Sequence, residues 1–199
     1  MKNLIKQGKV RYFGLSEAGS ETIKKAHKIQ KLSAVQNQYS IWTRQSERAV
    51  IPTCEELGIG LVAWGPLGTG FLTGNITPND TFDVNNDLRA TFPRFSKENM
   101  QANMPLVTML QDIATKKSKA CGIRVSPAQI ALAWILAQKP FIVPIPGMDK
   151  IEYIEDNIRC MDIVLDKEDL DEIETRLSQI EIKGERLSQT LLDDIVEDI

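Results

Sequence analysis

The stretch "VRYFGLSE", residues 10–17, decides the fold, because it is the first of four apolar segments that each precede a helical pattern. Its apolar and aromatic run predicts a β-strand over 10–16 that ends at the polar pair Ser16 and Glu17. Alternating strands and helices indicate an α/β fold in which right-handed crossovers join parallel strands. The other predicted strands cover residues 33–40, 60–68 and 141–147.

Helical patterns with recognisable start signals lie between and after these strands. The clearest start is at Ser126, where Pro127 occupies the first helical position and Gln129 completes a capping box. Ser20 and Asp149 are further candidate caps, each just before an apolar stripe with helical spacing. The predicted helices cover residues 20–31, 46–58, 104–122, 126–138, 149–161 and 166–180.

The composition is that of one soluble globular domain over residues 1–199. Of its 199 residues, 42% are hydrophobic and 26% are charged. The net charge of −3 argues against the basic surface that a nucleic-acid-binding protein needs. No apolar stretch reaches the roughly 18 residues of a membrane span. Residues 69–103 are too polar and too long for an ordinary connection, so we expect a lid-like insertion. Residues 181–199 form an acidic tail.

The three cysteines, Cys54, Cys121 and Cys160, are odd in number and far apart in the sequence. No pair has the spacing of metal ligands, so we expect reduced thiols and no metal site. Together with the lack of a signal-peptide pattern before the first strand, this favours a cytoplasmic protein.

Polar residues and glycines gather where the predicted strands end. They lie at residues 16–17, 36–38, 65–69 and 147–150. Ligands of parallel α/β folds bind at the carboxyl ends of the strands, so we expect the functional site there. The segment "GTGFLTG" (68–74) invites comparison with a dinucleotide-binding fingerprint, but its glycine spacing differs and no amphipathic helix follows directly.

Five segments resemble one known family in their order along the chain. They are "GKVRYFGLSE", "AVQNQYSIWTR", "LVAWGPLGTGFLTG", "SPAQIALAWILAQ" and "IVPIPGMDKIEYIEDNI". Together, from about residue 1 to about residue 180, they resemble the C-terminal half of the aldo-keto reductases. These are NADP-dependent (β/α)8-barrel oxidoreductases. The version here is most similar to the bacterial, fungal and plant branch that acts on small aldehydes and ketones.

The resemblance implies a TIM-barrel fold of parallel βα units, of which this chain forms the C-terminal four of eight strands, a partial barrel. "VRYFGLSE" would be the fifth strand, and four βα units would precede it. Such barrels usually need about 250 residues. A four-stranded half would leave two strand edges unpaired. We therefore expect a homodimer or pairing with an N-terminal half.

The resemblance also implies a binding site for NADPH or NADP, with NAD less expected. Ser16 and Gln36 would hold the nicotinamide carboxamide, and Trp64 would stack on the nicotinamide face. The loop that passes over the pyrophosphate would consist of Gly65, Pro66, Leu67, Gly68 and Thr69. The adenosine 2′-phosphate would be met by Gly147, Met148 and Lys150, and the adenine would be touched by Asp156 and Asn157.

Elementary chemistry agrees with parts of this assignment. A carboxamide needs a donor and an acceptor, and the amide of Gln36 has both. Lys150 lies in the first turn of a predicted helix, where its charge and the helix N-terminus both favour a phosphate. The alternatives are that Trp64 is a core residue and Lys150 a solvated charge. The family often has Asn where Glu17 stands, so of this pair only Ser16 carries over. The family usually has Thr or Ser where Met148 stands, which weakens the contact with the 2′-phosphate and with it the preference for NADP over NAD.

Reduction of a carbonyl also needs a proton donor to the developing alkoxide. In the family a Tyr, a Lys, an Asp and a His at the ends of the first four strands serve this step, and this sequence begins after them. Tyr39 is the best-placed remaining candidate, but no Lys or His lies near it in the sequence, and His27 is expected within a helix. We therefore assign no catalytic residue.

The expected function is the NADPH-binding half of an aldo-keto reductase-like oxidoreductase that reduces aldehydes or ketones to alcohols. Without the catalytic half it should be weak or inactive, so whether this chain alone is an enzyme is open. The alternatives are a non-catalytic NADPH-binding or regulatory subunit and an inactive truncated gene product. Cofactor titration followed by an aldehyde turnover assay separates the three.

Overall fold

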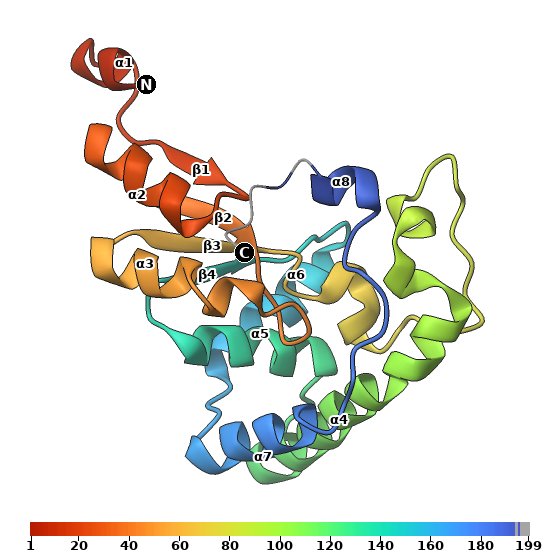
Figure 1. Ribbon diagram of the computed structural model, residues 1–199. Helices are drawn as coiled ribbons and strands as arrows, with labels where there is room; N and C mark the ends of the chain where they lie inside the picture. The colour runs from red at the N-terminus through yellow and green to blue at the C-terminus, as the bar shows by residue number, and fades with distance from the viewer. Residues whose placement is uncertain (194, 196–199) are drawn as a thin grey trace.

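The computed structural model describes residues 1–193 and 195, and its centre is one sheet of four parallel strands (Figure 1). The strands lie side by side in the order in which they occur in the chain. They are β1 (Gly14–Ser16), β2 (Ala34–Gln38), β3 (Gly60–Trp64) and β4 (Ile142–Ile145). Each crossover between neighbouring strands contains at least one helix. The predicted α/β fold with parallel strands is therefore confirmed.

The two faces of the sheet differ in burial. The covered face bears buried apolar side chains such as Val35 and Leu61, which are both 0% exposed. On the open face Ser16 and Gln36 are exposed Cα partners in adjacent strands. Val143 of the edge strand β4 is 57% exposed. Because side chains alternate between the faces along each strand, one face packs under helices and the other is open.

Helices cover the buried face in two layers. The inner layer consists of α2 (Ser20–Ile29), α3 (Val50–Leu57) and α5 (Pro127–Gln138) (Figure 1). Outside it, α4 (Lys97–Cys121) packs on α5, and α7 (Lys167–Leu177) packs on α4. The remaining helices are α1 (Lys2–Lys6), α6 (Ile151–Ile158) and α8 (Gln189–Asp193). None of the helices in the described chain is long and apolar enough to cross a lipid bilayer.

The predicted helix starts had mixed outcomes. The hydroxyl of Ser126 accepts the Gln129 backbone N–H at 3.2 Å, and the Gln129 side chain accepts the Ser126 N–H at 3.0 Å, which confirms the capping box. Ser20 is already the first residue of α2 rather than its cap. Asp149 does not cap α6, whose N-cap is Lys150, without a side-chain cap hydrogen bond. Lys150 therefore precedes the first turn instead of lying in it.

All four strands are shorter than predicted, β1 and β3 the most. β1 begins at Gly14 rather than at residue 10, and the first bond to the neighbouring segment runs from the Ser33 N–H to the Phe13 carbonyl at 3.0 Å. β3 ends at Trp64 because Gly65 takes a left-handed φ of 61°, which interrupts extended backbone. A short turn, η1 (Gln45–Glu47), replaces the predicted first turn of α3.

The predicted insertion at 69–103 ends earlier than expected. Helix α4 begins at Lys97, and its N-cap Ser96 accepts the backbone N–H of Asn99, so the last predicted insertion residues are helical. The prediction failed because residues 97–103 are mostly polar and Pro105, which usually marks a helix boundary, lies inside this helix.

Aromatic rings hold the remainder of the insertion against the core. The Phe95 ring packs edge-on against Trp42, Phe71 and Phe82, with ring centroids 6.4, 6.3 and 5.3 Å apart. Trp42 and Phe71 stack in parallel at 5.0 Å. Such pairs contribute beyond their buried area, so the insertion is a packed structure built from short turns. Its turns are η2 (Gly68–Thr73), η3 (Leu88–Thr91) and η4 (Pro93–Phe95).

The segment after α7 returns across the insertion to the carboxyl ends of the strands. The Asn103 side chain exchanges two hydrogen bonds with the backbone of Lys183, at 2.8 and 3.0 Å. Arg94 of the insertion donates from Nε to the Gly184 carbonyl at 3.2 Å. Arg186, two residues further on, is buried. The predicted acidic tail is therefore part of the packed fold as far as this residue.

The open face and the two sheet edges form a surface without cover in the described chain. There β1 and β4 each have a strand neighbour on one side only. On β4 and α6, Val143, Ile145, Ile151 and Ile158 are 57%, 44%, 73% and 55% exposed. Unpaired strand edges and large apolar surfaces are sites of association. We propose that a second copy, or a segment that supplies further strands, covers this surface in solution.

Sedimentation velocity tests this proposal. At micromolar concentration the isolated chain should sediment as a dimer or larger species, and Val143→Lys should shift it toward monomer because a charge cannot be buried there without cost. Val84→Lys, at a 75% exposed position in the insertion, is the control and should change nothing. A folded, stable monomer of the unaltered chain would contradict the pairing of two copies.

Candidate functional site

A cavity of about 1000 Å³ opens at the carboxyl ends of β3 and β4. Its walls come from the loop after β3, the insertion, the start of α5, the loop after β4 and the helix α6. The volume lies at the upper end of the range of roughly 300–1,000 Å³ that small-molecule and cofactor sites occupy. The cavity therefore lies where the strand ends predicted the site, and it has room for a ligand of cofactor size.

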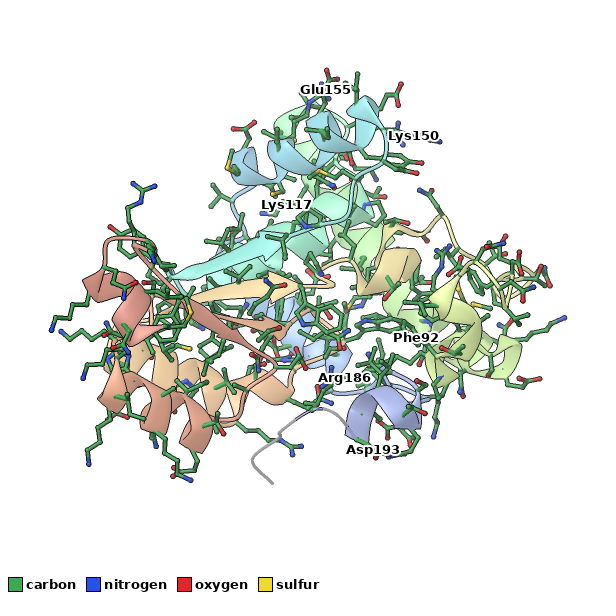
Figure 2. The ribbon with its side chains drawn as sticks, turned by 90° about the horizontal axis from the view of Figure 1, so that it is seen from above. Phe92, Lys117, Lys150, Glu155, Arg186 and Asp193 are labelled. Atoms are coloured by element: carbon green, nitrogen blue, oxygen red, sulfur yellow. The ribbon has the colours of Figure 1, made fainter. Side chains whose placement is uncertain are left out.

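Most of the residues assigned to the pyrophosphate and the adenosine line this cavity. Lys150 stands at its side as the N-cap of α6 (Figure 2), with its Nζ 5.3 Å from the ring centroid of the lining residue Tyr153. That these residues bind a cofactor stays a prediction. The lining residues among those predicted are Gly65, Pro66, Leu67, Thr69, Gly147, Met148, Asp156 and Asn157.

The loop after β3 reverses direction through several left-handed residues. Gly65, Gly68, Thr69 and Gly70 have φ values of 61°, 57°, 54° and 95°. Glycine adopts such values at little cost, whereas a β-branched residue such as Thr69 does not. Strained residues of this kind concentrate at ligand-binding loops. Thr69 lines the cavity and is exposed, so the strained backbone lies in the cavity wall.

Gly68 has a different reason to be glycine from the one predicted. A Cβ at this position would lie 2.5 Å from Nε1 of Trp42, whose ring is buried in the core. Gly68 itself is buried and is not among the residues that line the cavity. Packing against Trp42 explains this glycine without any phosphate.

The residues assigned to the nicotinamide lie on the open face, at the β1–β2 side of the cavity loop. Ser16 and Gln36 are exposed register partners, and within the described chain neither side chain makes a hydrogen bond. Trp64 ends β3 half-buried and is the register partner of Gln38. An amide with a free donor and a free acceptor beside an aromatic ring fits a flat carboxamide-bearing ring.

Glu17 holds the Trp64 ring in place. Its Oε1 accepts the indole N–H of Trp64 at 2.6 Å and the backbone N–H of Gln38 at 2.7 Å. Its own backbone is left-handed, with a φ of 46°. Where the family usually has Asn, Glu17 therefore acts as a structural acceptor that joins the ends of β1, β2 and β3.

Two arginines in the cavity wall had not been assigned from the sequence. Arg89 comes from the insertion and is held by Asp87 through Nε at 2.9 Å and Nη2 at 2.5 Å, with its guanidinium over the Phe82 ring. The hydrogen bonds that Arg89 donates to Asp87 raise the pKa of Arg89, so its guanidinium stays charged. Arg124 is exposed just before the cap of α5. No spacing rule identifies them, because the fold brings them to the cavity from distant segments.

Asp156 links two elements of the wall. Its Oδ2 accepts the Ser126 hydroxyl at 2.7 Å, and its Oδ1 accepts the Gln129 side-chain amide at 3.0 Å. The capping-box residues of α5 are thus tied to α6. The contact of Asp156 with an adenine stays a prediction, and its carboxylate already has a structural role.

The possible proton donors lie away from the open face. Tyr39 is 1% exposed, donates to Glu47 Oε1 at 2.8 Å and packs its ring 5.6 Å from Trp134 of α5. Burial raises the pKa of Tyr39 far above its ordinary value, and the bond to Glu47 raises it further. His27 accepts the Leu32 backbone N–H at its Nδ1 and so has a structural partner within the α2 region. Neither side chain is placed to protonate a ligand beside Gln36.

The described part of the chain contains three free cysteines, and its possible metal ligands are scattered. All three thiols are free, with Cys54 and Cys160 buried and Cys121 exposed. Burial raises the pKa of Cys54 and of Cys160 to about 11, so both stay protonated at neutral pH. No group of three or more His, Cys, Asp or Glu side chains within residues 1–193 and 195 is arranged to hold a metal ion.

Comparison with known proteins identifies the class. The model of the aldo/keto reductase family matches residues 1–177. The probable aldo-keto reductase 1 of Glycine max is 43% identical over 173 residues, which are 87% of this chain and 48% of that protein. The chain therefore belongs to the aldo/keto reductase family. It spans about half the length of this relative.

Solved structures show the same fold. The glycerol dehydrogenase of Gluconobacter oxydans matches with a TM-score of 0.78 at 23% identity, over 91% of this chain and 53% of that one. A thermostable aldo-keto reductase in complex with the inhibitor epalrestat matches with a TM-score of 0.61 at 24% identity, over 88% and 52%. The predicted TIM-barrel type of fold is confirmed, and four parallel strands in one sheet are consistent with a partial barrel.

The packing of Gly68 yields a stability prediction. Gly68→Ala should lower the free energy of unfolding by roughly 1–3 kcal/mol, because the new Cβ meets Trp42 and the left-handed backbone disfavours alanine. Gly147→Ala is the matched control, since nothing lies within 4 Å of its Cβ position and its φ is ordinary. Urea unfolding of both variants measures the difference, and equal midpoints would contradict the packing argument.

Proposed function

We propose that this chain forms the NADP(H)-binding half of an aldo-keto reductase-type oxidoreductase, which reduces an aldehyde or a ketone to an alcohol when the barrel is complete. The observation that supports this best is the order of the groups across the sheet. Ser16 and Gln36 lie on β1 and β2, the loop from Gly65 follows β3, and the loop from Gly147 follows β4. An extended dinucleotide has its nicotinamide, pyrophosphate and adenosine in the same order.

Each group of residues has a definite part in this proposal. Ser16 and Gln36 would bind the carboxamide and so orient the nicotinamide, with the Trp64 ring packed against its face. The left-handed loop from Gly65 would approach the pyrophosphate closely, because glycine backbone leaves room for an anion. The bound cofactor would supply the hydride, and the protein would hold and orient it.

Cationic groups at the cavity support the recognition of phosphates. Arg89 is already paired with Asp87, so it offers its remaining donors rather than a full free charge. Arg124 and Lys150 are exposed beside the loop after β4 and α6. We propose that Lys150 meets the 2′-phosphate, which would make NADP(H) bind more tightly than NAD(H).

In this proposal none of the described residues of this chain is the proton donor. Tyr39 and His27, the side chains considered from the sequence, have structural partners. We propose that the acid comes from the segment that completes the barrel, and that this chain alone has weak or no turnover. The same observation favours a second candidate, a non-catalytic NADPH-binding subunit, and an inactive product is the third.

We also propose a cytoplasmic location. The three free thiols, one of them exposed, are typical of proteins in a reducing compartment.

Fluorescence titration with NADPH, followed by an assay of aldehyde turnover, separates the candidates. We expect binding without measurable turnover by the isolated chain, and turnover once the complementary strands are added. Binding without turnover under both conditions would favour the non-catalytic subunit. Failure to bind NADPH would contradict the proposed function. If the isolated chain does turn over, Tyr39→Phe should leave the rate unchanged, because this hydroxyl is buried against Glu47.

Lys150→Met tests the cofactor preference. We expect affinity for NADPH to fall roughly tenfold, the worth of one charge-assisted hydrogen bond, while affinity for NADH stays the same. Lys28→Met, an exposed lysine on α2, is the control for loss of one positive charge. Equal losses for NADPH and NADH would show that Lys150 does not contact the 2′-phosphate.

A further inference from the structure

The first 31 residues of the chain are strongly basic, although the chain as a whole is acidic. They contain seven Lys and one Arg against two Glu, which gives this segment a net charge of +6, whereas the whole chain has −3. The remaining residues therefore carry −9, the difference between −3 and +6. All eight cationic side chains of the segment are exposed. The net charge of the chain thus conceals a separation of charge between its beginning and the rest.

The fold brings these cations to the amino ends of the strands. Helix α1 precedes β1, and the end of α2 precedes β2. Figure 1 shows α1 and the end of α2 on the same side of the molecule, away from the carboxyl ends of the strands. On α2 the exposed Lys24, Lys25 and Lys28 share the outer face, opposite the buried Ile23. In Figure 2 several nitrogen-tipped side chains project outward from this part of the chain.

Few of these cations are neutralised within the molecule. Among residues 1–193 and 195, Lys24 alone of the eight forms an ion pair, with the exposed Glu21 at 3.7 Å. Lys6 and Lys28 lie in the last turns of α1 and α2, where a cation interacts favourably with the helix dipole. The other cations have neither reason to be where they are. Charges of one sign repel one another in the compact state, so an anionic partner would stabilise this arrangement.

Exposed apolar side chains lie among the cations. Met1, Leu4, Tyr12 and Ile29 are 53%, 38%, 75% and 69% exposed. Ile29 ends α2 one turn after Lys25, so the two side chains are neighbours on the helix surface. We call the cationic and the exposed apolar side chains of residues 1–31 the basic surface. A surface of this composition is typical of segments that lie on anionic lipid, where the cations meet the headgroups and the apolar groups enter the interface.

Other classes of anionic partner fit the basic surface less well. Nucleic-acid phosphates favour the bidentate guanidinium of Arg, whereas seven of the eight cations here are Lys. Protein interfaces have an apolar centre from which charged residues, Lys in particular, are depleted. Here the apolar side chains are single and lie between lysines.

We propose that the basic surface binds the headgroups of anionic lipids and so attaches the protein reversibly to a membrane surface. The cytoplasmic leaflet contains such lipids. Helix α2 belongs to the layer over the covered face of the sheet, so the basic surface stays accessible when further protein covers the open face. The cavity lies at the opposite ends of the strands and would face away from the lipid. This inference does not depend on the proposed function.

Vesicle sedimentation with the full chain of 199 residues tests the proposal. The chain should sediment with phosphatidylcholine vesicles that contain roughly one third phosphatidylserine, and much less with phosphatidylcholine alone. Raising the salt from about 0.1 M to about 1 M shortens the Debye length from about 10 Å to about 3 Å and should release it. A chain that sediments with neither kind of vesicle, or equally with both, overturns the proposal.

Charge variants locate the contact. Lys2→Gln combined with Lys25→Gln should weaken binding to the phosphatidylserine vesicles roughly fivefold for each lysine, which corresponds to about 1 kcal/mol per cation. The same pair changed to Arg keeps the charge and should bind like the unaltered chain. Lys97→Gln with Lys119→Gln, two exposed lysines of α4, is the matched control and should change little. Equal losses in the two Gln pairs would show an effect of net charge alone and reject the basic surface.

An apolar variant separates lipid from other polyanions. Ile29→Ser should weaken vesicle binding severalfold, because an apolar side chain that enters the interface contributes in proportion to its buried area. Val84→Ser, at a 75% exposed position in the insertion, should not. The chain is also titrated with a short DNA duplex at the same salt concentration. Tighter binding to the duplex than to the vesicles, or vesicle binding unchanged in Ile29→Ser, would identify a general polyanion site and contradict the lipid assignment.

Discussion

Parallel strands are normally buried on both faces, because the crossovers that join them place helices over the sheet. In this chain α2, α3 and α5 cover one face, and side chains of the other, such as Gln36 and Val143, are in contact with solvent. The same face bears the residues proposed for the nicotinamide. One uncovered face therefore underlies both proposals, the position of the ligand and the packing of further protein.

The order of the strands determines how the parts of the proposed site are arranged. Because β1 to β4 are neighbours in chain order, the loops at their carboxyl ends form a row in the same order. The edge strand β4 leads into α6, so the end of the row that we propose for the adenosine has the least support from neighbouring strands. There the hydrogen bonds from Ser126 and Gln129 to Asp156 anchor α6 to α5. They give α6 the support that it lacks from a neighbouring strand.

Local signals predicted the parts of the fold that depend on neighbours in sequence. The box of Ser126 and Gln129 was found because its hydrogen bonds span three residues. Asp149 carried a similar pattern but does not cap, since the chain is not yet turned into the helix at that residue. The placement of Arg89 in the cavity and of Arg186 beside Glu17 depends on contacts between distant segments. Periodicity and spacing do not encode such contacts, so these residues were missed.

The insertion also differs from a freely hinged lid for a physical reason. Arg94 is buried, donates to the Thr43 hydroxyl at 2.6 Å, and lies with its guanidinium 4.8 Å from the ring centroid of Trp42. Burial lowers the pKa of Arg94 to about 10, so the guanidinium is still charged at neutral pH. Lifting this part of the insertion would remove the partners of a buried charge.

The stretch before Arg94 combines buried and exposed parts. The side chains of Phe71 and Ile76 are buried, whereas the turn in which Asp80 accepts the Thr77 N–H and hydroxyl is exposed. The stretch ends at Arg89, which lines the cavity and is held by Asp87 within the same stretch. Arg89 can move with the stretch without losing its partner, whereas Arg94 cannot. The insertion thus has one part that binds the C-terminal segment, at Arg94, and another that lines the cavity, at Arg89.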